Sequence, residues 1–188
     1  MTKFILHGGY TRQNSDSFFQ ELINDTPNMG KILSVYFACE IDAEIKFLEE
    51  VEKIKRLSDG REIYIDMANE SNFVEQLKES DVVYIRGGNT ELLKSKLAKY
   101  SEFSELIKGK TVAGSSAGAY VLSKYYYANS LDEVREGLGL VPVRVVCHYE
   151  SNIHPKIGDS DPVKMLDDFD SDIELVLLKD FEWKVFEL

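Results

Sequence analysis

The sequence predicts an α/β protein: a single three-layer domain in which helices cover both faces of a doubly wound, mainly parallel sheet. The chain has 188 residues, of which 44% are apolar, enough for one domain with a sizeable core. Short β-rich apolar runs alternate with longer segments of helical periodicity, which favours parallel strands joined by right-handed crossovers. No repeat or Pro/Gly-rich linker divides the sequence, so we expect residues 1–188 to form one domain.

The expected strands are short runs that are apolar almost throughout, as strands covered on both faces should be. In chain order they comprise residues 3–7, 31–38, 62–65, 81–86, 110–114, 139–149 and 173–178. Ligands of such folds bind at the carboxyl ends of the strands. Reactive groups are therefore expected in the residues that directly follow these runs.

The expected helices lie between the strands and carry apolar residues at spacings of three and four. Residues 15–24 place two phenylalanines, a leucine and an isoleucine on one face, and a Ser-Asp-Gly sequence ends the helix at residues 41–57. Further helices are expected at residues 72–79, after Thr90, after Ala119, and within the acidic stretch 159–174. The carboxylates of that stretch are predicted to be solvated.

Charge and cysteine content exclude several classes of function. The chain carries 22 basic and 33 acidic groups, a net charge of −11, whereas nucleic acid and anionic membranes require a basic surface. No apolar run approaches the roughly 18–20 residues of a membrane span, and two glycines interrupt the first run before it reaches signal-peptide length. We expect a soluble, cytoplasmic protein, with its oligomeric state left open.

No cofactor or metal is expected. The two cysteines, Cys39 and Cys147, and three histidines do not form a four-ligand zinc set. No Gly-x-Gly-x-x-Gly sequence follows the first strand, so a dinucleotide is not predicted either. Cys147 is expected to act as a small buried apolar group.

The most informative segment is residues 111–119, which contain Gly-x-Ser-x-Gly with Ser116 between Gly114 and Gly118. Its position between a buried strand and an apolar helix suits a sharp, strained turn that leaves the central hydroxyl exposed. The N–H groups that open the helix would face a developing oxyanion. We predict a nucleophile elbow at Ser116, the alternative being a tight turn of structural role only. Ser115 should point away from the cleft.

A serine nucleophile needs a base, and the chain offers three histidines. His148 follows a long strand at the edge where the elbow is expected, so it is the predicted general base. His154, in a loop beside Pro155, is a less favoured alternative. His7 ends the first strand and is expected to pack at the top of the sheet.

The base in turn needs an acid that orients it. Asp180 follows the last expected strand and reaches the same edge of the sheet. Asp132, Glu133 and Glu136 lie between the elbow helix and the histidine strand and are alternatives. The residue pattern does not choose among them.

Gly87 and Gly88 follow the fourth strand and form a second site-like loop. Glycines allow a close backbone approach and a freely oriented N–H, which an oxyanion hole requires. Asn89 or Thr90 can cap the helix that follows, and this role is compatible with the first.

Three segments together resemble a known family. They are Ile-Arg-Gly-Gly-Asn-Thr at residues 85–90, Val-Ala-Gly-Ser-Ser-Ala-Gly-Ala at residues 112–119, and Gly-Leu-Val-Pro at residues 139–142, which leads to His148 and Tyr149. In these the chain is similar to the peptidase E (aspartyl dipeptidase) family of serine peptidases, from its first strand to Trp183. The resemblance implies the class I glutamine-amidotransferase-like fold, which is flavodoxin-like.

Carried over residue by residue, the resemblance implies that Ser116 is the nucleophile and His148 its base, with the N–H groups of Gly88 and Ala117 forming the oxyanion hole. In the family a carboxylate a few residues before a tryptophan completes the triad. Asp180 takes that place here, as a shorter acid. An aspartate after the elbow helix is also regarded as important in the family, and Asp132 is the nearest match.

One departure concerns specificity. Family members that select an N-terminal aspartate use an arginine downstream of the histidine, but no arginine follows Arg144 here. Only Lys156 and Lys164 offer positive charge in that segment, and lysine lacks the two-pronged fit of guanidinium to carboxylate. The resemblance therefore leaves open whether an N-terminal aspartate is selected.

The predicted function is a serine-type hydrolase that cleaves short peptides by a Ser-His-acid mechanism. One alternative is an esterase or another hydrolase on the same site. A second is a catalytically silent binding module of the same fold. A glutamine amidotransferase would need a cysteine where Ser116 stands.

Overall fold

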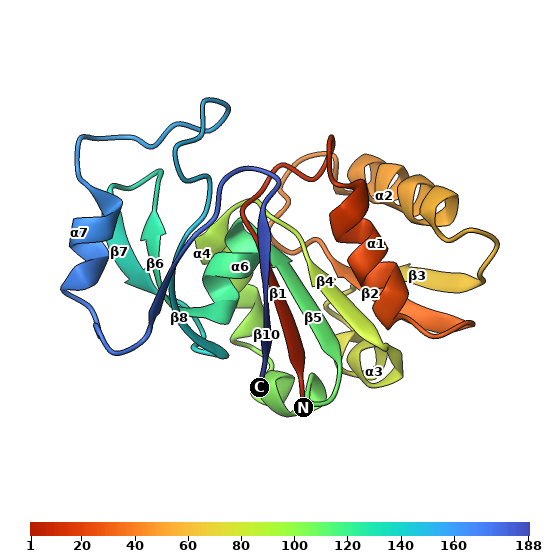
Figure 1. Ribbon diagram of the computed structural model, residues 1–188. Helices are drawn as coiled ribbons and strands as arrows, with labels where there is room; N and C mark the ends of the chain where they lie inside the picture. Colours follow the sequence, from red (N-terminus) through yellow and green to blue (C-terminus); the bar gives the residue numbers. More distant parts are fainter.

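The computed structural model describes residues 1–188 as two sheets with helices packed in layers against them (Figure 1). The larger sheet has six strands in the order β10-β1-β5-β4-β2-β3. They are β1 (Lys3–His7), β2 (Gly30–Val35), β3 (Ile63–Met67), β4 (Val82–Ile85), β5 (Thr111–Ser115) and β10 (Trp183–Glu187). Neighbours are parallel except for β10, which runs antiparallel to β1. The α/β prediction is confirmed, and the carboxyl ends of β1, β5 and β4 meet at the top of Figure 1.

The smaller sheet has four strands in the order β7-β6-β8-β9. They are β6 (Ser123–Ala128), β7 (Glu133–Glu136), β8 (Val141–Val146) and β9 (Glu174–Leu177). The sequence pattern predicted β8 and β9 but not their separation into a second sheet, and it predicted neither β6 nor β7. The cause is the short elbow helix, α6 (Ala117–Leu122), from which the chain enters β6 directly. Tyr126 and Tyr127 then face opposite sides of the small sheet, as successive strand residues do.

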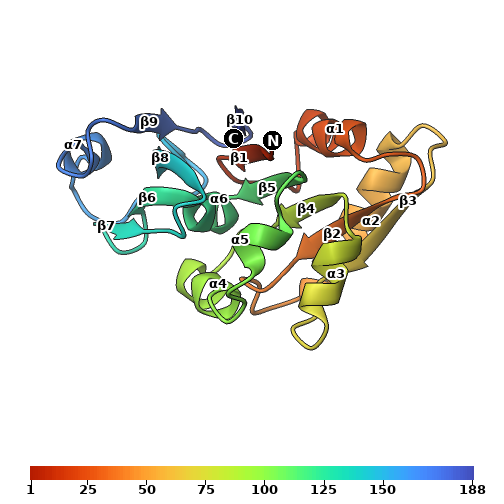
Figure 2. The same ribbon diagram turned by 90° about the horizontal axis from the view of Figure 1, so that it is seen from below.

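Helices cover both faces of the larger sheet (Figure 2). One face carries α1 (Asp16–Asp25) and α2 (Ala43–Leu57); the other carries α3 (Phe73–Glu79), α4 (Thr90–Leu97), α5 (Phe103–Leu106) and α6. In β1, Phe4 and Leu6 join the core on the α6 side and Ile5 joins the core under α1, which is the two-residue period of a strand. A last helix, α7 (Pro162–Asp167), packs on the outer face of the small sheet.

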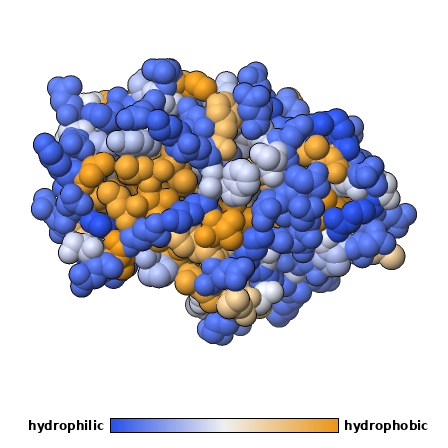
Figure 3. Space-filling model, viewed as in Figure 1, coloured by the Kyte–Doolittle hydropathy of each residue, from blue (hydrophilic) through white to orange (hydrophobic).

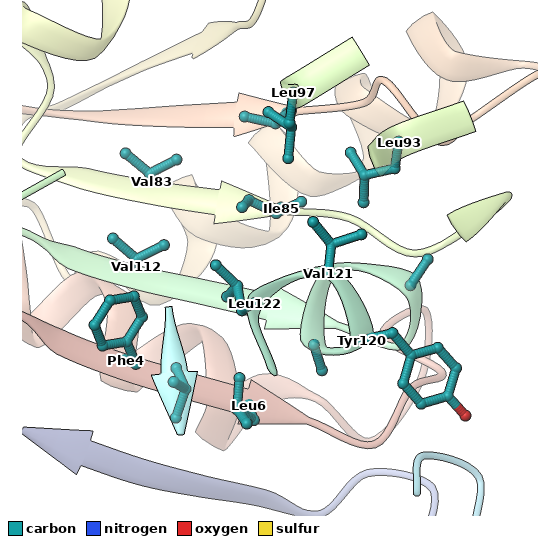
Figure 4. Packing of buried hydrophobic residues seen from close by; sticks show 14 of the residues in the cluster. Phe4, Leu6, Val83, Ile85, Leu93, Leu97, Val112, Tyr120, Val121 and Leu122 are labelled. Atoms are coloured by element: carbon teal, nitrogen blue, oxygen red, sulfur yellow. The ribbon is translucent and has the colours of Figure 1, made fainter. Parts of the chain in front are cut away.

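The largest core cluster fills the space around α6 (Figure 4). Val112 and Ile85 of the sheet face Val121 of α6 and Leu93 of α4. Every residue of α6 is buried, and its cluster also contains inward residues of β6, β8 and β9. The helix that begins directly after Ser116 is therefore clamped between two sheets, so the turn before it has little freedom to move.

The surface agrees with two of the sequence predictions. The carboxylates of the acidic stretch are exposed at Asp167, Asp168, Asp170 and Asp172, whereas Cys147 is fully buried. On the face of the molecule seen in Figure 3, apolar side chains gather on the left, over the small sheet. A groove there, between β9 and β10, is lined by residues that include Leu175, Leu177, Phe181 and Trp183. None of the helices is both long enough and apolar enough to cross a lipid bilayer.

Candidate active site

The backbone at Ser116 adopts the strained turn that the sequence predicts. Ser116 has φ 51° and ψ −109°, between the last residue of β5 and the first of α6. Few non-glycine residues adopt a positive φ, and those that do cluster at functional sites. The Ser116 N–H donates to the carbonyl of His7 at 2.9 Å, which ties the turn to the neighbouring strand β1.

Gly114 and Gly118 are required by close approach of backbone to backbone. A methyl group on Gly114 would lie 2.5 Å from the carbonyl carbon of Gly118, and one on Gly118 would collide with the carbonyl of Ile85 in β4. Only glycine at both positions lets α6 start so close to the sheet. The close backbone contacts thus explain why the motif has glycine at both positions, as the sequence suggested.

His148 lies directly in front of this turn. Its Nε2 is 2.9 Å from Ser116 Oγ, and its side chain is only 11% exposed. The residue follows β8, with φ 54°, and its N–H donates to the Gly8 carbonyl at 3.0 Å. Burial lowers the pKa of His148, while the hydrogen bond and charge of Asp180 oppose that shift.

Asp180 contacts the other nitrogen of the same ring. Its Oδ1 is 2.6 Å from His148 Nδ1, and its side chain is 10% exposed. The Ser151 hydroxyl donates to the second oxygen, Oδ2, and itself accepts the N–H groups of Ile153 and His154 at 3.0 and 2.8 Å. Both carboxylate oxygens are therefore held, one by the imidazole and one by the loop after β8.

Gly8 and Gly9, which follow β1, hold these segments together. The Gly8 N–H donates to the Glu182 carbonyl at 2.8 Å, and the Gly9 carbonyl accepts from Phe181 at 3.1 Å. The turn that carries Asp180 is thus fixed to the end of β1, while His148 is bonded to Gly8. Gly8 and Gly9 were expected only to end the first strand. In the structure they hold both the imidazole of His148 and the carboxylate of Asp180 in place.

Replacing Gly9 with alanine is expected to displace His148. The added methyl would lie 2.6 Å from His148 Nε2, at a backbone φ of +121°. A misplacement of about 1 Å at a reacting group can cost on the order of 10²-fold, so we expect kcat/KM of a reaction at Ser116 to fall by at least that factor. Gly60→Ala is the matched control, because φ there is +80° but no atom lies within 4 Å. It should cost roughly 1–2 kcal/mol of stability and leave activity unchanged. Equal activities of the two variants would contradict the expected collision.

Two backbone N–H groups beside Ser116 have no protein acceptor. They belong to Gly88, whose φ is +149°, and to Ala117, the first residue of α6. A methyl on Gly88 would lie 2.8 Å from the carbonyl carbon of Ala38, and one on Gly87 would lie 3.0 Å from Ser116 Cβ. The Gly87–Gly88 loop therefore lies against the elbow, while Asn89 caps α4 by accepting from Leu92 at 3.0 Å.

Ser116 and His148 line a cleft with a volume of about 1160 Å³. Its walls come from the loops at the carboxyl edge of the larger sheet, from the turn after β6 and from the segment after β8. They comprise residues 10–12, 38–41, 86–91, 128–131, 153–155 and 157, with Lys46, Tyr120, Tyr126, Ser115, Ser116 and His148. A cleft of this size can hold a small ligand or a short peptide.

The other two histidines do not contact Ser116. The His154 ring lies beside that of His148, with centroids 4.7 Å apart. His7 is fully buried, and its Nδ1 accepts from the Gly9 N–H at 3.0 Å and lies 3.2 Å from Ser115 Oγ. Burial lowers the pKa of His7 to about 3, so it stays neutral. His7 packs at the top of the sheet as predicted, and the Ser115 hydroxyl is turned toward it.

Asp132 is not brought to His148. The Tyr127 hydroxyl donates to its Oδ1, and this hydrogen bond is the main reason why the pKa of Asp132 is lowered. Its Oδ2 lies against Gly158, where a side chain would collide with it. Glu133 pairs instead with Arg135. Of the acids that the sequence left open, only Asp180 contacts the imidazole.

Sequence reasoning missed two residues of this site. Ser151 was not considered, although it lies three residues after the predicted base. Arg86 was quoted only as part of a motif, yet it lines the cleft beside the Gly87–Gly88 loop. Neither has a local signal: a serine in a polar loop and an arginine at a strand end are common on protein surfaces.

Comparison with known proteins shows a family and two similar structures. The model of peptidase family S51 matches residues 5–170. A crystal structure of a peptidase from an acI-B1 Actinobacterium has a TM-score of 0.71 and 24% identity, covering 100% of this chain and 84% of that one. A protein described as a peptidase E, from Listeria monocytogenes EGD-e, has a TM-score of 0.65 and 18% identity, covering 100% and 99%.

These structural similarities confirm the flavodoxin-like fold. A search of curated protein sequences finds no significant match. The family match covers both glycine loops, Ser116 and His148. Because that match extends over most of the sequence, the chain belongs to peptidase family S51 and is a serine peptidase.

Proposed function

We propose that the chain hydrolyses short peptides by acyl transfer to Ser116, with His148 as general base and Asp180 as the acid that orients it. The observation that carries this proposal is the continuous contact from Ser116 Oγ to His148 Nε2, 2.9 Å, and from His148 Nδ1 to Asp180 Oδ1, 2.6 Å. These are the distances and the order of a nucleophile, a base and an orienting carboxylate.

The proposed reaction proceeds in two halves. His148 Nε2 takes the Ser116 proton as Oγ bonds to the substrate carbonyl carbon, and the imidazolium then gives that proton to the departing amine. Water next attacks the acyl-enzyme, with the same imidazole accepting and returning a proton, and the acid is released. Asp180 keeps the proton on Nδ1 throughout, so that Nε2 is free to accept.

The oxyanion formed in each half is assigned to the N–H groups of Gly88 and Ala117. Both lack a protein acceptor, and they come from the two glycine-rich loops that meet beside Ser116. Donors held in place before the reaction cost no reorganisation when the charge develops. Removing one such donor typically costs about 10²–10³ in kcat.

The proposal is tested with a panel of dipeptides and activated esters, together with a fluorophosphonate probe. Hydrolysis of dipeptides, with the probe found on Ser116 by peptide mass spectrometry, is the expected result. Turnover of esters alone would assign an esterase on the same site. Reaction with neither substrates nor probe, by a folded protein, would overturn the proposal in favour of a silent binding module.

Activity should fall on the acid side with a midpoint below the ordinary histidine pKa of about 6.5. The active form has neutral His148, and burial disfavours its protonated form, so the lowered pKa keeps the base available at more acid pH. Below that pKa, kcat/KM should drop about tenfold per pH unit. A profile from about pH 4.5 to 8.5 measures it, and an acid midpoint above 6.5 would contradict the assignment.

Ser151→Ala is expected to move that acid limb upward. Without the hydroxyl, Asp180 loses a hydrogen-bond donor and becomes a stronger base toward the imidazolium, so the pKa of His148 rises. A hydrogen bond to a charged group contributes about 1.5–3 kcal/mol, and looser positioning of Asp180 should lower kcat roughly tenfold. Ser71→Ala, at an exposed serine that bonds only Asn69, is the control. An unmoved acid limb in Ser151→Ala would show that this hydroxyl does not act on the imidazole.

A further inference from the structure

Arg86 and His148 both line the cleft, His148 bonded to the end of β1 and Arg86 at the end of β4. Arg86 directly follows β4, which separates the strand of the nucleophile, β5, from β2. Its N–H donates to the Val35 carbonyl at 3.0 Å, so the backbone is fixed to β2. The next residue, Gly87, lies against Ser116, where an added methyl would be 3.0 Å from Ser116 Cβ. The guanidinium is thus carried by the segment that also carries the Gly88 N–H.

A buried acid holds the guanidinium in one orientation. Nη1 is 3.4 Å from Glu50 Oε2 and 3.3 Å from the Tyr36 hydroxyl, and the guanidinium lies over the Tyr36 ring at 5.3 Å. The Glu50 side chain is 1% exposed and also accepts from the Ser34 hydroxyl and, at 2.8 Å, from Tyr36. Removing these two charged groups from water costs free energy. The contact with Glu50 fixes the orientation of the Arg86 guanidinium.

The remaining donors of Arg86 are free. Nε and Nη2 make no hydrogen bond to protein, and the only buried side-chain N or O atom without a partner in the chain is His7 Nε2. The unbonded donors are therefore not fully buried, in a side chain that is 13% exposed and that lines the cleft. Of the acids on the same walls, Glu91 pairs with Arg135 and Glu40 bonds Asn89. The charge of Arg86 is paired with Glu50 through Nη1, and the Nε and Nη2 donors are left without a protein partner on the wall of the cleft.

We propose that Arg86 is a specificity-determining residue that binds a carboxylate of the peptide substrate. The inference rests on the proposed function, because it places the ligand in the cleft of Ser116. The planar fork of a guanidinium matches a carboxylate with two parallel N–H···O bonds. A carboxylate held there would orient the scissile carbonyl toward Ser116 and the Gly88 N–H. The carboxylate is either the C-terminal one of a short peptide or that of an acidic side chain, and the chemistry of recognition is the same.

Two matched substrate pairs test the proposal. Ala-Leu against Ala-Leu-amide varies the terminal carboxylate, and Asp-Leu-amide against Asn-Leu-amide varies the side chain. We expect kcat/KM to favour the acid member of at least one pair by roughly 10- to 100-fold, the range of a charged hydrogen-bonded contact. Arg86→Gln should reduce that ratio to near one while the neutral member is still hydrolysed, and Arg86→Lys should keep part of it. Arg56→Gln, at an exposed arginine paired with Asp16, should leave the ratio unchanged.

Failure of this inference and failure of the proposed function are distinguishable. Equal turnover of acid and neutral members by the unaltered protein, or a preference that persists in Arg86→Gln, would overturn the role of Arg86 alone. Calorimetric binding of the same peptides to Ser116→Ala needs no turnover and tests the subsite even if Arg86→Gln does not fold. Tighter binding of the acid member there supports the subsite even when no peptide is cleaved, whereas equal binding overturns it.

Discussion

Ser116→Ala should lower kcat for peptide hydrolysis by about 10⁴–10⁶-fold and leave the fold intact, because a triad without its nucleophile keeps only the catalysis of its oxyanion hole and binding. Alanine retains Cβ, so the strained turn, with φ 51°, and the burial of α6 are unchanged. Only Oγ and its 2.9 Å contact with His148 are lost. Steady-state kinetics and thermal unfolding of the same preparation measure the two effects.

Ser115→Ala is the matched control for this variant. Ser115 is the adjacent residue, but its hydroxyl is buried against His7 and not directed at His148. We expect its activity to stay within about tenfold of the unaltered protein, since most effects away from the reacting groups are small. If Ser115→Ala were inactive and Ser116→Ala active, the assignment of the nucleophile would be wrong.

Asp180→Asn should lower kcat by about 10⁴-fold, the loss that follows when an orienting carboxylate becomes an amide. The amide has almost the same shape, but it can donate toward Nδ1, which favours the tautomer with its proton on Nε2. In that tautomer His148 cannot accept the Ser116 proton. The loss should appear in kcat far more than in KM, because the change acts on the base and not on the bound peptide.

Asp132→Asn separates the two candidate acids. Its carboxylate bonds the Tyr127 hydroxyl and lies against Gly158, without contact to the imidazole. A neutral amide still offers an oxygen to Tyr127, so the expected loss of kcat is tenfold at most. A larger loss for Asp132→Asn than for Asp180→Asn would reverse the assignment of the acid.

Some features of this chain are local and could be predicted from neighbouring residues. The elbow depends on a strand, two glycines and a serine within nine residues, and its strained φ follows from small residues at both sides. The four inner strands of the larger sheet, β1, β5, β4 and β2, are largely apolar and buried because helices cover both faces. Predicted and observed bounds of β1, β4 and β5 accordingly agree closely. Strand β6 was missed because it follows the short helix α6 without a break, and β7 and the edge strand β10 contain exposed residues that interrupt the apolar pattern.

Only the tertiary structure decided which side chains contact Ser116, His148 and Arg86. Asp180 and Asp132 both follow elements near the site, and what separates them is the turn after β9, which Gly8 and Gly9 bind to the end of β1. The contact of Ser151 with Asp180 spans 29 residues, and that of Glu50 with Arg86 spans 36. Hydrogen bonds between segments so distant in sequence depend on how sheets and loops pack, and no periodicity of the chain encodes them. The sequence by itself thus determined the α/β class and the strained serine turn, while the packing of two sheets around α6 decided which acid, which loop hydroxyl and which buried charge surround that serine.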